Sequence, residues 1–507
     1  MAKYDFVIIG SGLGGLLCGY MLAKEGRSVC ILEKNRQLGG NLQIFVRDKA
    51  IFDTGIHYIG GLDKGQNLYQ YFKYFGLMDN LKLRRMDPEG FDVVAFGDDP
   101  VEYPYAMGYE RFQERLLEKF PKEKEAISKY CAKLQEIGAS SPLYNVQAPS
   151  GGDFFRTEYL TMNARDYIAS LSSNTKLHGV LAGTNSLYAG IGDKSPLYVH
   201  ALIVNSYIES SYKCIDGGAQ IATHLSKEIK RFGGEIKNYA EASKFNFSGD
   251  EIKSVELKSG ETFEGKTFIS NIHPANTMEM VGQGNIRKAY YNRLTSLENT
   301  CGVFILYAVF KPDTFKYLDY NYYYHKNQDV VWDPLENKNV SWPPSYAMFI
   351  PASSKSEKYA DCATVMAFMK YDDVKPWEDT FHTIPKHRTN RSESYEEFKE
   401  RKCQEIIDVV NERFPNFRSS IKSFTASSPL TNRDYIGIKD GSIYGVLKDH
   451  KDPIKTFIPP KTKIPNLYFT GQNINLHGVL GVTISAVTTC AEFLGIDYLI
   501  NEIKKAQ

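Results

Sequence analysis

A glycine-rich turn and an acidic residue near the start of the chain have the types and spacing that dinucleotide binding requires. Gly10, Gly12 and Gly15 fit the pattern G-x-G-x-x-G, and Glu33 follows at close to the roughly 20-residue separation at which an acid meets a ribose hydroxyl. In such a site the first glycine permits a tight turn, the second lets the backbone approach a pyrophosphate, and the third lets helix and strand pack closely. The residues that we predict around the diphosphate and ribose are Gly10, Gly12, Leu13, Gly14, Gly15, Glu33 and Lys34.

The segments around this turn have the patterns needed to position it. Phe6–Ile9 is a short apolar run typical of a buried parallel strand, Leu16–Lys24 has a helical pattern, and Ser28–Leu32 predicts a second strand. The order strand, glycine turn, helix, strand, acid is that of a dinucleotide-binding βαβ unit, whose helix N-terminus favours phosphate. The alternative is a glycine-rich turn in an ordinary α/β domain. The sequence has no second G-x-G-x-x-G and therefore predicts one dinucleotide site.

A second glycine pair, Gly39–Gly40, follows soon after Glu33. It suggests another close approach of the backbone to a long cofactor, which a nicotinamide enzyme does not need at this place. Flavoproteins of the amine oxidase and phytoene desaturase type carry such a pair, and this stretch resembles theirs. Those proteins usually have arginine after the glycines. This chain has Asn41 there, which brings no charge to a phosphate.

Three longer stretches resemble the retinol saturase family, a branch of the carotenoid desaturase and isomerase group. They are Phe52–Gly61, Glu102–Lys124 and Pro465–Cys490, and the resemblance extends over almost the whole chain. It implies an α/β fold in which a Rossmann-like FAD/NAD(P)-binding domain is joined to a discontinuous α+β substrate domain, as in amine oxidases and phytoene desaturases.

The resemblance assigns the dinucleotide site to FAD. Asn473 stands where the family has an acid that meets the ribityl chain, and a helix beginning near Gly481 is implied to direct its positive end at the isoalloxazine, favouring the anionic reduced flavin. Ala242 is implied to lie against the adenine through its backbone. The further FAD-binding residues that the resemblance implies are Gly39, Gly40, Asn41, Gly55, Ile56, His57, Ala242, Asn271, Gly471, Asn473, Gly481 and Val482.

Both expected domains are discontinuous. We expect the nucleotide domain to take residues 1–75, 210–290 and 460–507, and the substrate domain to take 76–209 and 291–459. The first substrate-domain segment is predicted to be helix-rich, with Pro121 ending or restarting an amphipathic helix. Strands predicted after residue 240 are Glu241–Phe247, Ile252–Leu257, Thr262–Ile269, Cys301–Lys311, Asn321–His325 and Ala363–Met369, and a helix is predicted at Tyr395–Phe414.

Composition excludes several classes of function for this 507-residue chain. The formal net charge of +1 gives no electrostatic footprint for nucleic acid, and the eight cysteines lack the spacing of a metal site, so we predict neither nucleic-acid nor metal binding. Cysteine usage and the absence of a long apolar run favour a cytoplasmic protein, peripheral to membranes at most. The 34 tyrosines and 29 phenylalanines fit either ordinary aromatic packing or a cavity for a greasy, conjugated ligand.

The leading hypothesis is an FAD-dependent oxidoreductase acting on carbon–carbon double bonds of a polyene or isoprenoid-like lipid. The resemblance implies a retinol-saturase-like reductase, with NAD(P)H as a transient electron donor and His57 as the candidate catalytic residue nearest the flavin. The first alternative is a carotenoid desaturase or cis–trans isomerase, because one flavin can take or give hydride. The second is a prenyl or lipid carrier of the same fold without redox activity. The chain does not indicate an oligomeric state.

Overall fold

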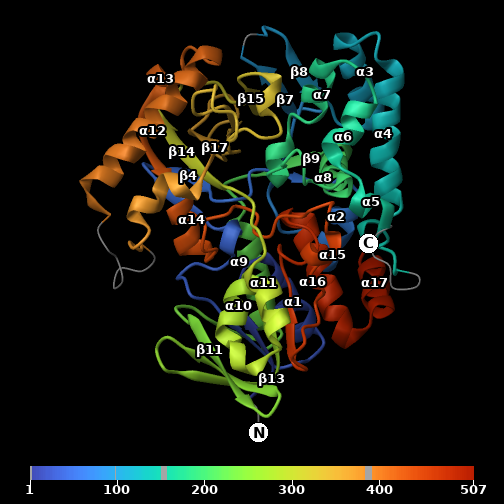
Figure 1. Cartoon of the computed structure of the whole chain (residues 1–507), viewed down its shortest axis with the longest axis vertical. Helices are drawn as coiled ribbons and strands as arrows, with labels where there is room; N and C mark the ends of the chain where they lie inside the picture. The colour runs from blue at the N-terminus through green and yellow to red at the C-terminus, as the bar shows by residue number, and fades with distance from the viewer. Residues whose placement is uncertain (1–2, 98, 150–156, 383–390) are drawn as a thin grey trace.

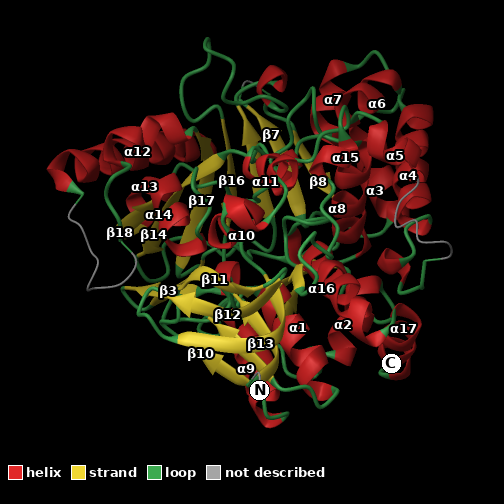
Figure 2. Cartoon of the chain, turned by 60° about the horizontal axis from the view of Figure 1, so that its bottom comes forward, coloured by secondary structure: helices red, strands yellow, loops and turns green. Residues whose placement is uncertain are grey.

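Two sheets of seven strands each form the framework of the protein, shown as a computed structural model in Figures 1 and 2. The structure describes residues 3–97, 99–149, 157–382 and 391–507. In Figure 1 the first sheet lies at the bottom with the N-terminus. The second lies above it at the left, and a group of helices lies above it at the right.

The first sheet holds the predicted dinucleotide-binding βαβ unit, and we call it the nucleotide-binding sheet. Its strand order is β10-β2-β1-β13-β12-β11, with β19 paired to β13. Strand β1 is parallel to both β2 and β13. Its residues are nearly all buried, and a short apolar run of this kind is typical of the centre of a parallel sheet. Its strands are β1 (Tyr4–Ile9), β2 (Val29–Leu32), β10 (Glu235–Lys237), β11 (Ala242–Ser248), β12 (Glu251–Leu257), β13 (Thr262–Ser270) and β19 (Leu467–Phe469).

Helix α1 (Leu13–Lys24) follows the glycine turn and packs against both α9 (Ala219–Arg231) and α16 (Gly478–Leu494). Eleven of its twelve residues are buried, which explains its nearly uniform apolar composition. The predicted βαβ unit is therefore confirmed. Other helices of this part are α10 (Pro274–Val281), α11 (Lys288–Thr295), α15 (Pro453–Thr456) and α17 (Ile496–Lys505).

The second sheet has the order β18-β14-β17-β16-β15-β7-β8. Its strands are β7 (Asp92–Phe96), β8 (Glu102–Tyr105), β14 (Gly302–Phe310), β15 (Asn321–His325), β16 (Ser345–Phe349), β17 (Cys362–Met369) and β18 (Ile421–Ser427). Side chains alternate across β15: Tyr322 and Tyr324 pack in one hydrophobic core, while Tyr323 packs in another. The long helix α12 (Ser392–Arg413) contacts β18, and the short α13 (Phe417–Ser420) and α14 (Pro429–Ile436) flank that strand.

The helices at the right of Figure 1 lie beside the second sheet. Pro121 separates two of them as predicted, since α3 ends at Lys119 and α4 begins at Lys124. The elements of this part are α2 (Asn67–Tyr74), α3 (Tyr109–Lys119), α4 (Lys124–Ala139), α5 (Thr157–Thr161), α6 (Ala164–Ser170), α7 (Thr175–Leu181), α8 (Leu197–Glu209), and a small sheet of β5 (Ile59–Gly60), β9 (Ser211–Cys214) and β6 (Leu83–Arg85). The hairpin of β3 (Ile44–Arg47) and β4 (Ala50–Asp53) lies apart from these helices, where β4 contacts β17 of the second sheet.

Two local predictions differ from the structure. The stretch from 76 to 105 contains three strands, β6, β7 and β8, where sequence analysis predicted helices and loops. Strand β7 is completely buried between β15 and β8, and a short apolar run of that kind has no periodicity that separates strand from helix. The last long helix, α16, begins at Gly478, before the predicted start near Gly481.

Each of the two sheets takes its strands from a different set of chain segments. The nucleotide-binding sheet takes its strands from within residues 1–75, 210–290 and 460–507, and the second sheet takes its strands from within 76–209 and 291–459. Within the ranges that the structure describes, no helix combines the length and the apolar character that crossing a membrane requires.

Candidate functional site

A cavity of about 1620 Å³ is lined by residues of both sheets. Part of its wall is the glycine turn, Glu33 and Ala242, and another part is aromatic, with Tyr207, Tyr323 and Phe349. The volume exceeds the roughly 300–1,000 Å³ of a site for one drug-sized ligand. It therefore has room for a long cofactor together with a second, apolar ligand.

The glycine turn places the start of α1 at this cavity. Gly10 has a φ of +94°, and a Cβ added to Gly15 would lie 2.1 Å from the Gly10 carbonyl oxygen, so glycine is needed at both positions. Helix α1 has no side-chain cap at Gly12 and no acidic residue in its first turn. No acidic side chain of the helix therefore offsets its N-terminal positive end, which suits an anionic group. The Asn271 amide, turned so that its oxygen faces the helix, accepts from Gly12 N at 3.3 Å and from Gly15 N at 3.2 Å.

Glu33 stands at the end of β2 with its carboxylate already anchored. One oxygen, Oε2, accepts hydrogen bonds from the Ser11 backbone N–H and hydroxyl, and Oε1 accepts one from the Asn35 N–H at 2.8 Å. The side chain is buried yet lines the cavity. A carboxylate oxygen has capacity for a second hydrogen bond, so Oε1 can still accept one from a ribose hydroxyl.

The Gly39–Gly40 turn lies directly against the first glycine turn. A bridge joins Gly12 to Gly39, and a Cβ on Gly40 would lie 3.3 Å from Gly12 Cα. The second glycine pair therefore serves packing between the two turns as well as lining the cavity. Lys34 and Asn35 then tie this region to α14, because they donate to the carbonyl oxygens of Asp434 at 2.7 Å and Tyr435 at 3.0 Å.

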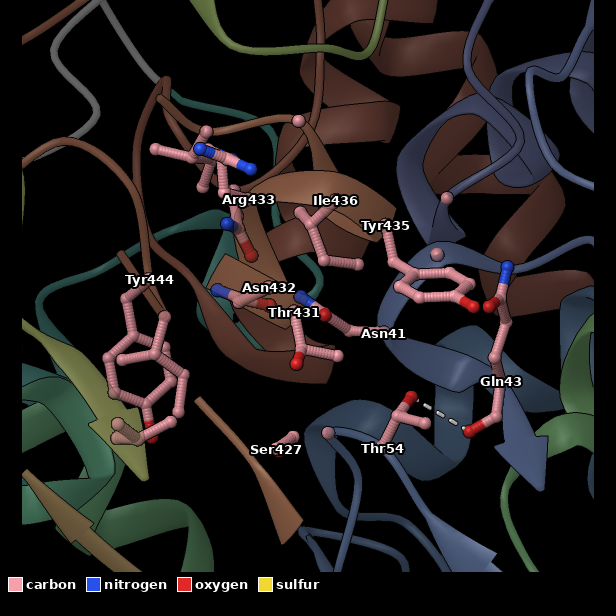
Figure 3. Close-up of a pocket in the computed structure, with 18 of the residues that line it drawn as sticks. Asn41, Gln43, Thr54, Ser427, Thr431, Asn432, Arg433, Tyr435, Ile436 and Tyr444 are labelled. Carbon is pink, nitrogen blue, oxygen red and sulfur yellow. Dashed lines mark hydrogen bonds between the residues drawn. The ribbon is translucent and has the colours of Figure 1, made fainter. Parts of the chain in front are cut away.

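Figure 3 shows the α14 side of the cavity, where Thr431, Tyr435 and Ile436 lie near Asn41 and Gln43. The dashed line is the hydrogen bond from the Thr54 hydroxyl to the Gln43 carbonyl, 2.9 Å long. Sequence analysis assigned none of the α14 residues to the site. The polar residues of this helix have no recognisable spacing, and only the fold brings them beside the glycine turns.

The C-terminal loop closes another part of the cavity. The Asn473 side-chain oxygen accepts from the Val446 N–H at 3.1 Å, which leaves the amide NH₂ as the group able to donate to a ligand. Beneath it, the fully buried Lys448 donates to the carbonyl oxygens of Thr456, Asn473 and Ile474 at 2.9–3.0 Å. Burial lowers the pKa of Lys448 to about 7. The lysine positions the loop that carries Asn473.

The predicted catalytic residue, His57, lines the cavity with its ring stacked on Phe349 at 4.3 Å. Its Nε2 is buried and has no hydrogen-bond partner among the described residues. Burial, assisted by the positive charge of Lys213, lowers the His57 pKa to about 3. The ring is neutral near pH 7 and can hydrogen-bond to a ligand, but it holds no imidazolium proton to give. Its catalytic role stays a prediction.

A tyrosine pair that sequence analysis missed lies in the aromatic part of the wall. The hydroxyl groups of Tyr58 and Tyr323 are 2.8 Å apart, and Tyr58 donates to Asp92 Oδ2 at 2.8 Å. Both tyrosines line the cavity, and Tyr58 also stacks on Tyr207 with ring centroids 4.2 Å apart. The abundance of tyrosine was a general signal of an aromatic cavity, but it did not identify these residues.

Most of the predicted cofactor-binding residues line this single cavity. Three glycines do not line it, because they lie behind the wall. Gly15 packs against Gly10, Gly471 against Asn271, and Gly481 against Leu476. The uncapped helix start, the glycine turns and the anchored Glu33 carboxylate together fit a dinucleotide. The predicted residues on the wall are Gly10, Gly12, Leu13, Gly14, Glu33, Lys34, Gly39, Gly40, Asn41, Gly55, Ile56, His57, Ala242, Asn271, Asn473 and Val482.

Comparisons with known proteins agree with this geometry. The family model of the NAD(P)-binding Rossmann-like domain matches residues 8–75. All-trans-retinol 13,14-reductase of Danio rerio is 28% identical, in an alignment covering 96% of this chain and 85% of that protein. Prolycopene isomerase 2, chloroplastic, of an Oncidium hybrid cultivar is 26% identical, covering 98% of this chain and 84% of that protein. The predicted resemblance to these two groups is confirmed.

Solved structures confirm the fold. Cyclohexylamine oxidase from Brevibacterium oxydans IH-35A superimposes with a TM-score of 0.60 at 13% identity, covering 99% of both chains. A CLA-producing fatty acid isomerase from P. acnes superimposes with a TM-score of 0.63 at 12% identity, covering 97% of this chain and 99% of that one. The amine oxidase-like architecture predicted from the sequence is correct.

Proposed function

We propose that this protein is an FAD-dependent oxidoreductase that adds two hydrogens across one carbon–carbon double bond of a polyene or isoprenoid-like lipid, in the manner of a retinol saturase. The observation that carries this proposal is the continuity of the cavity, because one space joins the dinucleotide-binding turn to a wall of aromatic side chains. The similarity to all-trans-retinol 13,14-reductases over nearly the whole chain supports the same conclusion.

The residues that would hold FAD follow from the geometry. The N-terminus of α1 would face the diphosphate, Glu33 the adenosine ribose, and Asn473 with the start of α16 the flavin end. When bound, FAD supplies two-electron hydride chemistry. The aromatic wall would exclude water and hold the double bond in place for reaction. Since the sequence has a single dinucleotide motif, NAD(P)H would act as a donor that visits the site transiently.

Two other functions remain as outcomes of the test. An isomerase is supported by the similarity to prolycopene isomerases, and it would change the geometry of the double bond without changing the mass. A lipid carrier of the same fold would bind the polyene without a flavin. The carrier is disfavoured by the anchored Glu33 and the uncapped α1, since such a protein has no need of either.

The test begins with the colour of the purified protein, which is expected to be yellow from one bound FAD. The bound flavin is then reduced with dithionite without oxygen, and all-trans-retinol and related polyenes are added in turn. A saturase reoxidises its flavin while one polyene gains two hydrogens and its absorbance shifts to the blue. A product of unchanged mass would instead assign the isomerase, and a colourless protein that binds polyenes would assign the carrier.

A further inference from the structure

We propose that Tyr323 is the catalytic residue that gives the proton in this reaction, and that Tyr58 and Asp92 are positioning residues that pass a proton to it. This inference rests on the proposed function and names the proton donor of the same site. It follows from a chain of three hydrogen-bonded side chains that begins in the protein interior and ends at the cavity wall.

The three side chains come from three different elements. Asp92 opens β7, Tyr323 is the central residue of β15 beside it, and Tyr58 precedes β5. Asp92 Oδ1 accepts from the Asn321 amide at 2.9 Å, so its other oxygen, Oδ2, faces Tyr58 at 2.8 Å. The Tyr58 hydroxyl therefore has two partners, Asp92 and Tyr323, while among the described residues the Tyr323 hydroxyl bonds only to Tyr58. With Asp92 ionised, Tyr58 donates to Asp92, and the Tyr323 O–H is used on Tyr58. With Asp92 protonated, the carboxyl donates to Tyr58, Tyr58 donates to Tyr323, and the Tyr323 O–H is left to donate into the cavity.

Burial isolates this chain from bulk water. Asp92 is 1% exposed and does not line the cavity, whereas Tyr58 and Tyr323 both do. Among the described residues, the hydrogen bonds that lead from this carboxyl group to the cavity wall run through the two tyrosine hydroxyls. A proton that moves along the chain therefore arrives at one defined place on the wall.

The burial of Asp92 favours the protonated carboxyl. Burial raises the pKa of Asp92 to about 7, although the hydrogen bonds from Asn321 and Tyr58 and the positive charge of Lys213 act in the opposite direction. Lys213 is itself fully buried, and burial lowers its pKa to about 7, so its charge does not hold Asp92 firmly ionised. The other titratable groups that interact with Asp92 are Tyr105 on β8, Tyr207 on α8 and Tyr323 on β15.

The atoms and electrons of the saturation step balance if reduced FAD supplies the hydride, as the proposed function requires, and no further reactant is needed. A hydride, carrying two electrons, forms a C–H bond at one carbon of the double bond, and the π bond breaks. The neighbouring carbon takes the Tyr323 hydroxyl proton, Tyr323 takes the proton of Tyr58, and Tyr58 takes the proton of Asp92. Asp92 is left as a carboxylate and regains a proton before the next turnover, passed back through Tyr323 and Tyr58 from water that enters the cavity after the product leaves. Reduced FAD, when bound, would supply the hydride and be oxidised, and the polyene would be reduced.

His57 is the competing proton donor on the same wall. Its pKa of about 3 leaves no imidazolium at neutral pH, and its Nε2 has no described partner from which a proton could be passed on. The tyrosine chain has such a partner in Asp92. The structure therefore favours Tyr323 over His57 for this task.

The experiment compares Tyr323→Phe, Tyr58→Phe and Asp92→Asn with a matched control, Tyr322→Phe. Tyr322 is the preceding residue on β15, is as deeply buried, and bonds to Glu102 at 2.8 Å on the other face of the sheet. Each protein is loaded with FAD, reduced with dithionite and mixed with all-trans-retinol in D₂O. The rate of saturation and the stereochemistry of the deuterated carbon are measured from pH 5 to pH 9.

We expect Tyr323→Phe to lower the rate of saturation about 100-fold or more, the usual contribution of a positioned general acid, with unchanged polyene binding. Deuterium should enter from both faces in this variant and from one face in the wild type and in Tyr322→Phe. The wild-type rate should fall as the pH rises through about 7, and Asp92→Asn should lose that fall. Saturation rates and stereochemistry that match the wild type in Tyr323→Phe would overturn the proposal.

A second measurement does not depend on activity. The infrared carbonyl band of a protonated carboxyl group is recorded at pH 6 for the wild type and for Asp92→Asn, and their difference isolates Asp92 from other buried acids. A band present in the difference and lost above pH 7 supports the relay, and its absence overturns it. If the wild type binds polyenes but saturates none, the proposed function fails, and the proton-donor role fails with it. If the wild type saturates a polyene and the three variants do so at the same rate, the proposed function stands and the relay alone is wrong.

Discussion

Ser11 and Glu33 form the link between the glycine turn and the second strand. Ser11 donates to Glu33 Oε2 twice, from its backbone N–H at 3.0 Å and from its hydroxyl at 2.6 Å. The turn proposed to face the diphosphate and the acid proposed to face the ribose are thus held as one unit. On this proposal, a substitution at Glu33 changes both a ligand contact and the position of the turn.

The first prediction concerns Glu33→Gln. The amide NH₂ of glutamine cannot accept from Ser11 or Asn35, and the charge-assisted bond to the ribose is lost. We expect FAD affinity to fall by about 10- to 100-fold, corresponding to roughly 1.5–3 kcal/mol. Titration of the apoprotein with FAD, followed by flavin fluorescence, measures the effect, and Glu235→Gln on neighbouring β10 is the control. Unchanged affinity in Glu33→Gln would show that the acid does not meet the cofactor.

The second prediction concerns Gly15→Ala, which tests the packing of α1. The new Cβ would lie 2.1 Å from the Gly10 carbonyl oxygen, a backbone atom that cannot turn away. We expect a loss of about 1–3 kcal/mol or more in stability, seen as a lower melting temperature, together with loss of bound flavin. Gly284→Ala is the control, because its Cβ would meet nothing within 4 Å. Equal melting temperatures for the two variants would contradict the close contact.

The third prediction concerns the pH dependence of stability through Asp53. This buried carboxylate accepts from the Gly218 N–H at 2.7 Å, and burial raises its pKa to about 7. Because the unfolded value is about 3.9, the folded state binds the proton more tightly, so stability is lost as the pH rises from about 4 to about 7 and is constant above. Asp53→Asn keeps the acceptor for Gly218 but has no proton to lose.

We therefore expect the melting temperature of Asp53→Asn to rise relative to the wild type between pH 5 and pH 7, by an amount that reflects about 2 kcal/mol of the roughly 4 kcal/mol lost over the whole range. Thermal unfolding followed by circular dichroism at several pH values measures this difference. The exposed Asp250→Asn serves as the control. Wild-type and Asp53→Asn curves that stay parallel across this range would refute the prediction.

The fourth prediction concerns membranes. We propose that the protein contacts membranes reversibly to collect its lipid-like substrate. In flotation with phospholipid vesicles, we expect part of the protein to rise with the vesicles and to be released by carbonate or high salt. Retention until detergent is added would argue for a tighter anchorage than this proposal allows.

The sequence by itself was sufficient to predict the βαβ unit that carries the glycine turn and Glu33. Gly10, Gly12, Gly15 and Glu33 lie close together in the chain, and the hydrogen bonds and contacts that require them are local, so their spacing reports the structure directly. The strands of β14, β15 and β17 and the helix α12 were also predicted within a few residues, because long or strongly patterned apolar segments leave little choice. The match of the longer stretches to known flavoproteins supplied the fold.

Only the tertiary structure determined the substrate end of the cavity. Tyr58 is 34 residues from Asp92 and 265 residues from Tyr323, and such contacts leave no spacing in the sequence. The strand β7 that carries Asp92 is short and fully buried, and it was not predicted. Likewise, the burial that makes His57 neutral and Asp92 protonatable depends on every element that surrounds them. A residue type reports which chemistry is available, but its pKa and its partners are set by the packing of distant segments.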